Sequence, residues 1–196
     1  MDYYGKVKQF NLRKDYLTDV KVAKLLVDYC LTSSIIKRIF IIGTGLGADI
    51  DIIKDKKMVQ LTGIEPRITF YEEAFKEYRR RGGKLLNMTL GEFVNKSRRR
   101  LSGIFLFVHS INHIPRYELK LLRKLMRNSF VIIINPNPEL ERIVGKTDKT
   151  VISYLTCSKI ERILNCSTIF DFFYHPVKIK GKEVSLREAI LLRSKS

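Results

Sequence analysis

The chain has no tryptophan and only three cysteines among its 196 residues. Cys30, Cys157 and Cys166 are odd in number and lack the paired spacing of a metal site. We therefore expect reduced, mostly buried thiols and no metal centre, in a protein of the cytoplasm.

Long hydrophobic runs are also absent. No segment approaches the roughly 18 uninterrupted apolar residues that span a bilayer. The opening sequence M-D-Y-Y-G-K-V-K lacks the apolar centre of a signal peptide. These absences predict a cytoplasmic chain without a membrane partner, and they leave its oligomeric state unknown.

Acidic residues are scarce. Twenty Asp and Glu face 37 Lys and Arg, which gives a net charge of +17. Such an excess favours a polyanionic partner, with RNA as the first candidate. A Lys- and Arg-rich composition that serves solubility explains the same number, so a small-molecule or protein substrate stays open.

Hydrophobic residues make up 45% of the chain, enough for one packed domain of this length. Apolar runs alternate with segments of helical periodicity, which predicts an α/β fold. We expect a single-domain, doubly wound, mostly parallel sheet with helices on both faces. The expected strands are 37–42, 58–64, 84–87, 103–108 and 130–134. The expected helices are 18–30, 48–53, 68–81, 91–96, 116–127 and 158–164.

Local signals mark some element ends. Thr69 and Glu72 have the spacing of a capping box at a helix start. The segment 135–150 opens with N-P-N-P and is expected to be a loop, because proline disfavours helix. Residues 168–174 and 189–193 are interpreted as two final strands, although a terminal helix over 184–192 fits the pattern too.

The domain division is simple. Residues 1–33 form an N-terminal segment and helix, and residues 34–196 form the main domain. Tyr3, Tyr4 and Phe10 alternate with cations near the start of the chain. Aromatic rings between cations are able to stack on a flat substrate, so this segment is a candidate lid. A frayed terminus is the other interpretation.

One stretch points to a ligand. The apolar run from Ile35 ends in three glycines, Gly43, Gly45 and Gly47. A second apolar run ends at Glu65, about twenty residues further on. Glycines let backbone approach a ligand closely, and the acid accepts hydrogen bonds from ribose hydroxyls. The layout predicts a nucleotide-type site at the carboxyl edge of a parallel sheet.

Three motifs extend this pattern: F-I-I-G-T-G-L-G-A-D (40–49), G-I-E-P (63–66) and F-L-F-V-H-S-I-N-H-I (105–114). On these the chain resembles the class I S-adenosylmethionine-dependent methyltransferase family, over roughly residues 37–136. The resemblance implies S-adenosylmethionine as cofactor and methyl transfer to an oxygen or nitrogen nucleophile. Gly43-x-Gly45-x-x-Ala48 also satisfies a dinucleotide fingerprint, so an NAD(P)-binding protein remains an alternative.

The resemblance assigns cofactor contacts position by position. The glycine loop would hold the methionine part through Gly43, Thr44, Gly45 and Gly47. Asp49 would steady the loop or the amino group. Glu65 would accept the ribose hydroxyls, and Pro66 would border the adenine.

Two further loops complete the expected site. Met88, Thr89 and Leu90 stand where the family often has an acid that binds the adenine amino group, so Thr89 is a departure from its pattern. His109 and Ser110 end the fourth strand, at the mouth near the transferable methyl group. His109 and His113 are the candidate catalytic residues, with packing or loop roles as the other interpretation.

The sequence also predicts on which side of the fold the basic runs lie. Arg79–Arg81 end one predicted helix, Arg98–Arg100 follow another, and Arg123, Lys124 and Arg127 lie late in a third. Helix ends of this kind gather opposite the ligand crevice of a doubly wound fold, where cations complement the helix dipole. The runs are weak support for a nucleic-acid substrate. They would suit a docking surface, including that of a catalytically inactive methyltransferase-like module.

Overall fold

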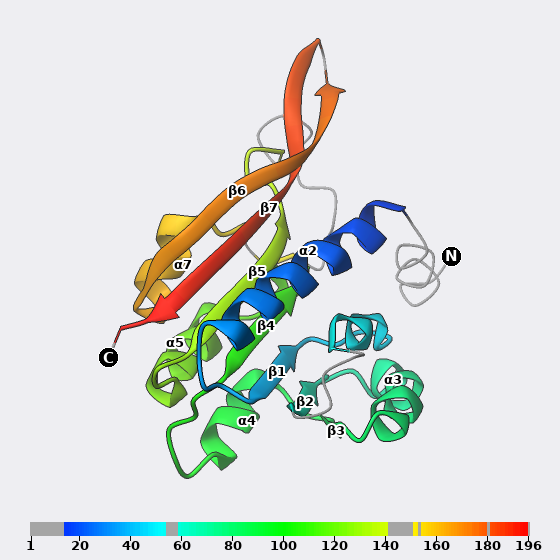
Figure 1. The fold of residues 1–196 in the computed structure, drawn as a ribbon, viewed down its shortest axis with the longest axis vertical. Helices are drawn as coiled ribbons and strands as arrows, with labels where there is room; N and C mark the ends of the chain where they lie inside the picture. Colours follow the sequence, from blue (N-terminus) through cyan, green and yellow to red (C-terminus); the bar gives the residue numbers. More distant parts are fainter. Residues whose placement is uncertain (1–13, 54–58, 141–150, 153, 180, 196) are drawn as a thin grey trace.

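The computed structural model describes residues 14–53, 59–140, 151–152, 154–179 and 181–195. Helices and strands alternate through most of the chain (Figure 1). In chain order the elements are α2 (Lys14–Thr32), β1 (Arg38–Ile42), η1 (Ala48–Ile53), β2 (Gln60–Ile64), α3 (Ile68–Arg80), β3 (Lys84–Leu86), α4 (Leu90–Lys96), β4 (Ile104–Val108), η2 (Ile111–His113), α5 (Arg116–Leu125), β5 (Phe130–Pro136), α7 (Cys157–Leu164), β6 (Cys166–Ile179) and β7 (Lys182–Ser194).

The strands form one seven-stranded sheet in the order β3-β2-β1-β4-β5-β7-β6. Strands β1 to β5 are parallel, and β7 is antiparallel to both β5 and β6. This confirms the expected doubly wound, mostly parallel sheet. The strand order reverses between β1 and β4, and ligands of such folds bind at that reversal, outside the carboxyl ends of the strands.

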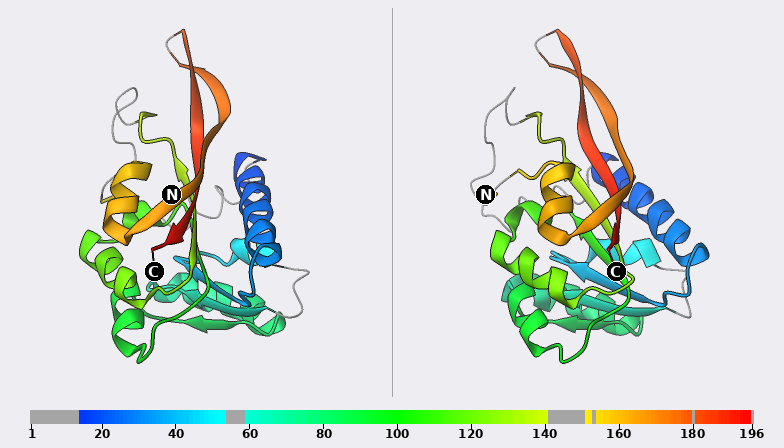
Figure 2. Two further views of the ribbon diagram at one scale, coloured as in Figure 1. Left: turned by 60° about the vertical axis from the view of Figure 1, so that its left-hand side comes forward. Right: turned by 90° about the vertical axis from the view of Figure 1, so that its left-hand side faces the viewer.

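Both faces of the sheet are covered, as its apolar strands require. Ile39 and Ile41 pack beneath α2, η1 and α3, whereas Phe40 and Ile42 pack against α4, α5 and α7 on the other face. Figure 2 shows α2 on one side of the sheet and α5 and α7 on the other. The glycine loop therefore starts from a strand that both layers hold in place.

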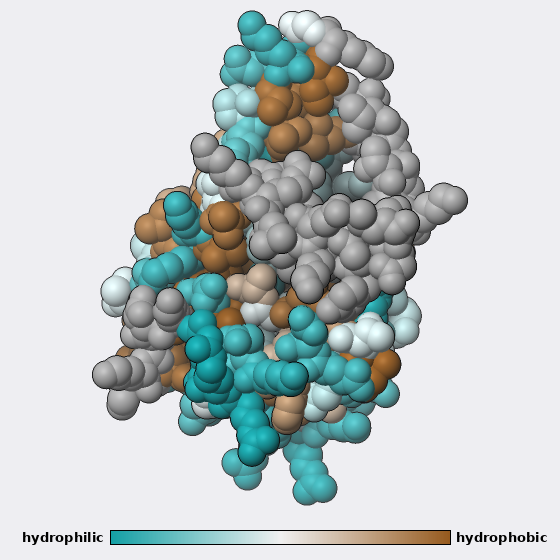
Figure 3. Space-filling model, turned by 90° about the vertical axis from the view of Figure 1, so that its right-hand side faces the viewer, coloured by the Kyte–Doolittle hydropathy of each residue, from teal (hydrophilic) through white to brown (hydrophobic). Residues whose placement is uncertain are grey.

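The end of the chain consists of strands, and the alternative of a terminal helix over 184–192 is wrong. Leu191 faces one core layer and Leu192 faces the other, which is the period-2 alternation of a strand. β6 and β7 are longer than expected, and their hairpin projects beyond the body of the molecule (Figure 1). Seen from the side that carries α3, hydrophobic residues gather on this projection and hydrophilic residues over the lower part (Figure 3).

The loop expected over 135–150 begins two residues later than the sequence predicts. Asn135 and Pro136 belong to β5, where they pair with Glu188 and Arg187 of β7. Proline is tolerated there because the pairing of β4 with β5 ends at Ile134, so the missing N–H leaves no gap in that ladder. Residues 141–150 lie outside the described residues.

Helix α2 begins at Lys14, before the expected start at residue 18, and is part of the core. Its residues Ala23, Val27 and Cys30 are fully buried. The helical part of segment 1–33 is thus a packed layer, and the lid expected from Tyr3, Tyr4 and Phe10 lies outside the described residues. Within the described ranges, no helix combines the length and apolarity that crossing a membrane would need.

Candidate functional site

The loop after β1 turns on glycines with positive backbone angles. Gly43 has φ of 73° and Gly45 has φ of 53°, values that side chains disfavour. A Cβ on Gly43 would lie only 2.7 Å from the Cβ of Ser110, which follows β4. The Ser110 hydroxyl in turn donates a hydrogen bond to the carbonyl of Ile42. The loops after β1 and β4 are therefore locked together where the strand order reverses.

Glu65 joins a third loop to this pair. Its carboxylate accepts hydrogen bonds from the backbone nitrogens of Gly45 at 2.8 Å and Arg67 at 3.0 Å. The side chain is buried, and burial raises its pKa although the two N–H donors and the charge of Arg67 act in the opposite direction. Each carboxylate oxygen still has a free lone pair with which to accept a ligand hydroxyl.

The three glycines have different surroundings. A Cβ on Gly47 would lie 3.0 Å from the Cβ of Ala74, so packing of α3 already accounts for this glycine. At Gly45, no described atom lies within 4 Å of the place where a Cβ would be. Gly45 thus offers open space next to the Glu65 carboxylate.

Two buried polar side chains flank the loop. The Thr44 hydroxyl is buried and has no hydrogen-bond partner among the described residues. Asp49 accepts a hydrogen bond from the hydroxyl of Tyr16 in α2. Burial raises the pKa of Asp49 to about 7, with a further contribution from the nearby charge of Glu65. Asp49 therefore ties α2 to the loop, a contact with Tyr16 that the sequence did not indicate.

The loop after β3 has structural roles. Thr89 caps α4: its hydroxyl accepts from the backbone nitrogen of Glu92 at 3.1 Å, and its own backbone nitrogen donates to the Glu92 carboxylate at 2.7 Å. Leu90 is buried in the core, and Met88 packs against that core. The carbonyl of Pro66 accepts from the Asn87 side chain at 3.2 Å. The adenine contacts expected here stay predictions.

His109 is held from α2. Its Nε2 lies 2.8 Å from the carboxylate of Asp19, and its φ of 56° is unusual for a residue with a side chain. Asp19 also accepts hydrogen bonds from the Tyr174 hydroxyl at 2.7 Å and from Nε of Arg187 at 3.0 Å. Burial alone would raise the pKa of Asp19, but these three partners hold it below its ordinary value.

This network, Asp19 with His109, Tyr174 and Arg187, joins α2, the loop after β4, β6 and β7. His113 lies at the end of η2, where its backbone nitrogen donates to the carbonyl of Ser110. In the described ranges, no three His, Cys, Asp or Glu side chains are grouped as a metal ion would require.

Comparisons with known proteins bear on the fold. No protein-family model matches the chain, and no curated protein matches it. Solved structures do match the chain. An S-adenosylmethionine-dependent methyltransferase from Archaeoglobus fulgidus matches with a TM-score of 0.73 at 14% identity, over 98% of this chain and 100% of that one.

Two further structures carry more specific names. The N-methyltransferase NodS from Bradyrhizobium japonicum matches with a TM-score of 0.68 at 12% identity, over 95% of this chain and 99% of that one. The plantazolicin methyltransferase BpumL, solved with S-adenosylhomocysteine, matches with a TM-score of 0.66 at 16% identity, over 96% and 89%. The sheet order, the glycine loop at its reversal point and these likenesses agree that the chain has the fold of class I S-adenosylmethionine-dependent methyltransferases.

Proposed function

We propose that this protein is a methyltransferase that uses S-adenosylmethionine and acts on a nitrogen or oxygen nucleophile. The observation that carries the proposal is the hydrogen bond from Gly45 to Glu65. It sets an open stretch of glycine backbone beside a buried carboxylate at the reversal point of the sheet. That pairing suits a ligand with both a charged amino-acid end and a ribose.

The residues present fit this cofactor. The open backbone at Gly45 gives room for the methionine end, and the unpartnered Thr44 hydroxyl would gain a hydrogen bond that a buried polar group normally has. The free lone pairs of Glu65 would accept the ribose hydroxyls. When bound, S-adenosylmethionine supplies a methyl group activated by its sulfonium.

The chain's own contribution to the reaction is alignment of the acceptor. Placing the acceptor in line with a reactive group supplies much of a displacement's rate, and a base is needed only for a protonated nucleophile. His109 stands at the end of β4, and Asp19 fixes its ring from α2. We propose His109 as the side chain that meets the acceptor, with Asp19 as its positioning residue and with His113 and Ser110 nearby.

RNA is the acceptor we propose to test first, because the net charge of +17 favours polyanions. NodS is named for nitrogen methylation, which agrees with a nitrogen acceptor. A non-catalytic docking module and an NAD(P)-binding protein are the competing proposals, and each predicts a different ligand.

Calorimetry with S-adenosylmethionine and S-adenosylhomocysteine tests the proposal. We expect the wild-type chain to bind both, and Glu65→Gln to weaken binding by about tenfold or more, as loss of a hydrogen bond to a charged group does. Glu73→Gln, an exposed change on α3, is the matched control and should bind like wild type. Binding of RNA without either cofactor would favour the docking module, and binding of NADH would favour the dinucleotide alternative.

A further inference from the structure

A basic pocket lies away from the glycine loop. It encloses about 740 Å³. Its apolar part consists of Met126, Ile163 and Leu164. Six cationic side chains also line it, all of them exposed: Arg100, Lys120, Arg123, Lys124, Arg162 and Lys195.

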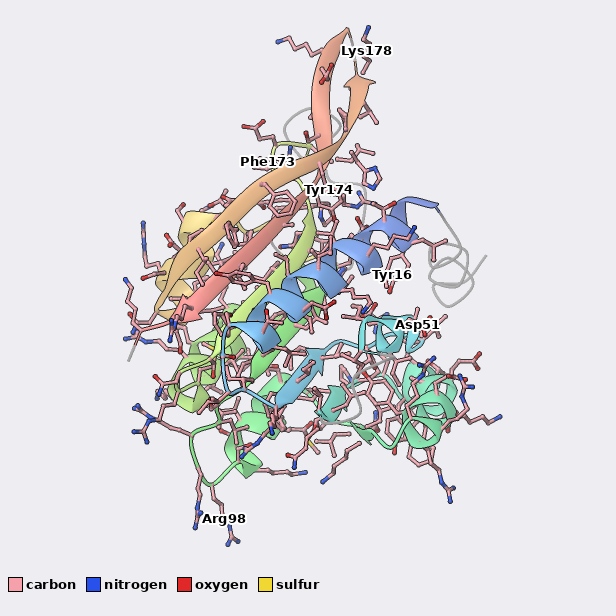
Figure 4. The ribbon with its side chains drawn as sticks, viewed as in Figure 1. Tyr16, Asp51, Arg98, Phe173, Tyr174 and Lys178 are labelled. Carbon is pink, nitrogen blue, oxygen red and sulfur yellow. The ribbon has the colours of Figure 1, made fainter. Side chains whose placement is uncertain are left out.

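The topology places this pocket at the amino edge of the parallel strands. Arg100 precedes β4 and Met126 precedes β5, while Ser194 ends the antiparallel β7. The glycine loop follows β1 at the carboxyl edge. Figure 4 agrees: Arg98, two residues before Arg100, extends from the edge opposite Tyr16 and Asp51. The pocket is therefore a separate site and not part of the candidate cofactor site.

The charges of the pocket are only partly compensated: the carboxylate of Glu161 on α7 interacts with the charge of Lys195, but Glu161 does not line the pocket. No acidic residue lines it, and none of the six cations forms an ion pair within the described part of the chain. Arg80 and Arg81 on α3 show the contrast, because they pair with Glu77 and Asp51. Clustered like charges repel one another, so the pocket has a favourable field for an anion.

A favourable interaction with the carboxyl end of a helix explains the position of only half of the six cations. Arg123 and Lys124 lie in the last turn of α5, and Arg162 lies in the last turn of α7. Arg100 and Lys195 belong to connecting or terminal segments, and Lys120 lies in the middle of α5. Four separate parts of the chain thus direct positive charge at one concavity.

We propose that this pocket binds the phosphodiester backbone of single-stranded RNA and so docks RNA on the side opposite the cofactor site. Sites for small ligands enclose them among a few polar groups. Here every cation is exposed, and the charge continues past the pocket through the exposed Arg98, Arg99 and Arg127. An extended basic surface suits a polymer whose successive phosphates are contacted without regard to sequence.

The inference goes beyond methyl transfer and holds whether or not the glycine loop binds a cofactor. The test compares two double variants that remove the same charge. Arg123→Ala with Arg162→Ala changes the pocket, and Lys76→Ala with Arg79→Ala changes exposed positions on α3. Fluorescence anisotropy measures binding of a single-stranded RNA of about 12 nucleotides over a range of salt concentrations.

We expect the pocket variant to bind RNA about tenfold or more weakly than wild type near physiological salt. A plot of the logarithm of its binding constant against the logarithm of salt concentration should be shallower by about 1.4 in slope. Each lost phosphate contact on a single strand reduces that slope by about 0.7. The control variant should stay within about twofold of wild type. Calorimetry should give the same affinity for S-adenosylhomocysteine in all three proteins. That result would separate the pocket from the cofactor site.

Three outcomes would overturn the inference. The first is an equal loss in both variants, which would mean that net charge alone attracts RNA. The second is no RNA binding by the wild-type chain. The third is tight one-to-one binding of inorganic tripolyphosphate, lost in the pocket variant, without binding of RNA; it would assign the pocket to a small polyphosphate.

Discussion

Two buried Asp carboxyl groups near the carboxyl edge of the sheet differ in their partners. Asp19 meets His109 and Arg187, and these partners hold its pKa below the ordinary value despite burial. Asp49 is buried, and burial with the like charge of Glu65 raises its pKa to about 7, although the hydrogen bond from Tyr16 acts in the opposite direction. The same residue type is thus a fixed anion in one place and a group that titrates near neutrality in the other.

The raised pKa of Asp49 gives stability a pH dependence. Ionising this carboxyl is harder in the folded chain than in the unfolded one, so the free energy of unfolding should fall as pH rises from about 4 to about 7. Asp49→Asn lacks the titration. Between pH 5 and pH 8, the free energy of unfolding of wild type should fall by on the order of 2 kcal/mol relative to that of this variant.

Urea unfolding of the cofactor-free chain at several pH values measures the difference. Glu73→Gln, an exposed change on α3, should follow the wild-type curve at each pH. If wild type and Asp49→Asn gave parallel curves between pH 5 and pH 8, the assigned titration of Asp49 would be wrong.

Individual site residues were predictable from sequence where the signal is local. Gly43, Gly45 and Glu65 stand at the ends of apolar runs, and the structure joins Gly45 to Glu65 by a hydrogen bond. Asp19 and Tyr16 were missed because their partners are distant in sequence and the pairing exists only after the sheet has formed. Nothing in the helical periodicity of α2 distinguishes these two from other helix residues.

At the scale of elements, the Thr-x-x-Glu spacing of a capping box occurs near the start of two helices, and a capping box forms at only one of them. Thr69 and Glu72 were expected to form a capping box, but α3 begins after Arg67 with no side-chain cap. Thr89 and Glu92 have the same spacing and do form one at the start of α4. The resemblance to a methyltransferase predicts a cofactor contact for Thr89, whereas in the structure its side chain caps α4.

These two threonines make a matched pair for measurement. Thr89→Ala removes the hydroxyl that accepts from Glu92 and should lower the free energy of unfolding by about 1 kcal/mol. Thr69→Ala makes the same chemical change in the first turn of α3, without a cap to lose, and should be nearly neutral. Chemical unfolding of both variants checks this.

A second measurement separates capping from ligand binding. Calorimetry with S-adenosylhomocysteine should give wild-type affinity for Thr89→Ala if capping is its whole role. A loss of affinity would support the expected contact with adenine. A Thr89→Ala protein as stable as wild type would contradict the capping assignment.

For whole elements, the sequence predicted whether a segment is a helix or a strand better than it predicted where that segment begins and ends. The five parallel strands are rich in apolar residues, and each begins and ends within two residues of its expected bounds. The tail was ambiguous because residues 184–192 are compatible with either a helix or a strand. Pairing with β5 decided it, since Leu191 lies beside Ile132 in the register, and a partner strand is not visible in the periodicity of one segment.

At the scale of the whole molecule, the core is two layers joined by one sheet. β7 lies between β5 and β6, and its consecutive residues Leu191 and Leu192 contribute to opposite layers. Both side chains are fully buried. If the sheet couples the layers, damage to either one must destabilise the whole chain.

Leu191→Ala and Leu192→Ala should therefore behave alike. Each leaves a cavity in a packed core and should lower the free energy of unfolding by about 2–5 kcal/mol. Leu25→Ala, the same change at a side chain that is 69% exposed on α2, should cost far less. Urea unfolding followed by far-ultraviolet and near-ultraviolet circular dichroism should show one coincident transition for every variant. Separate transitions in either core variant would mean that the two layers unfold independently of one another.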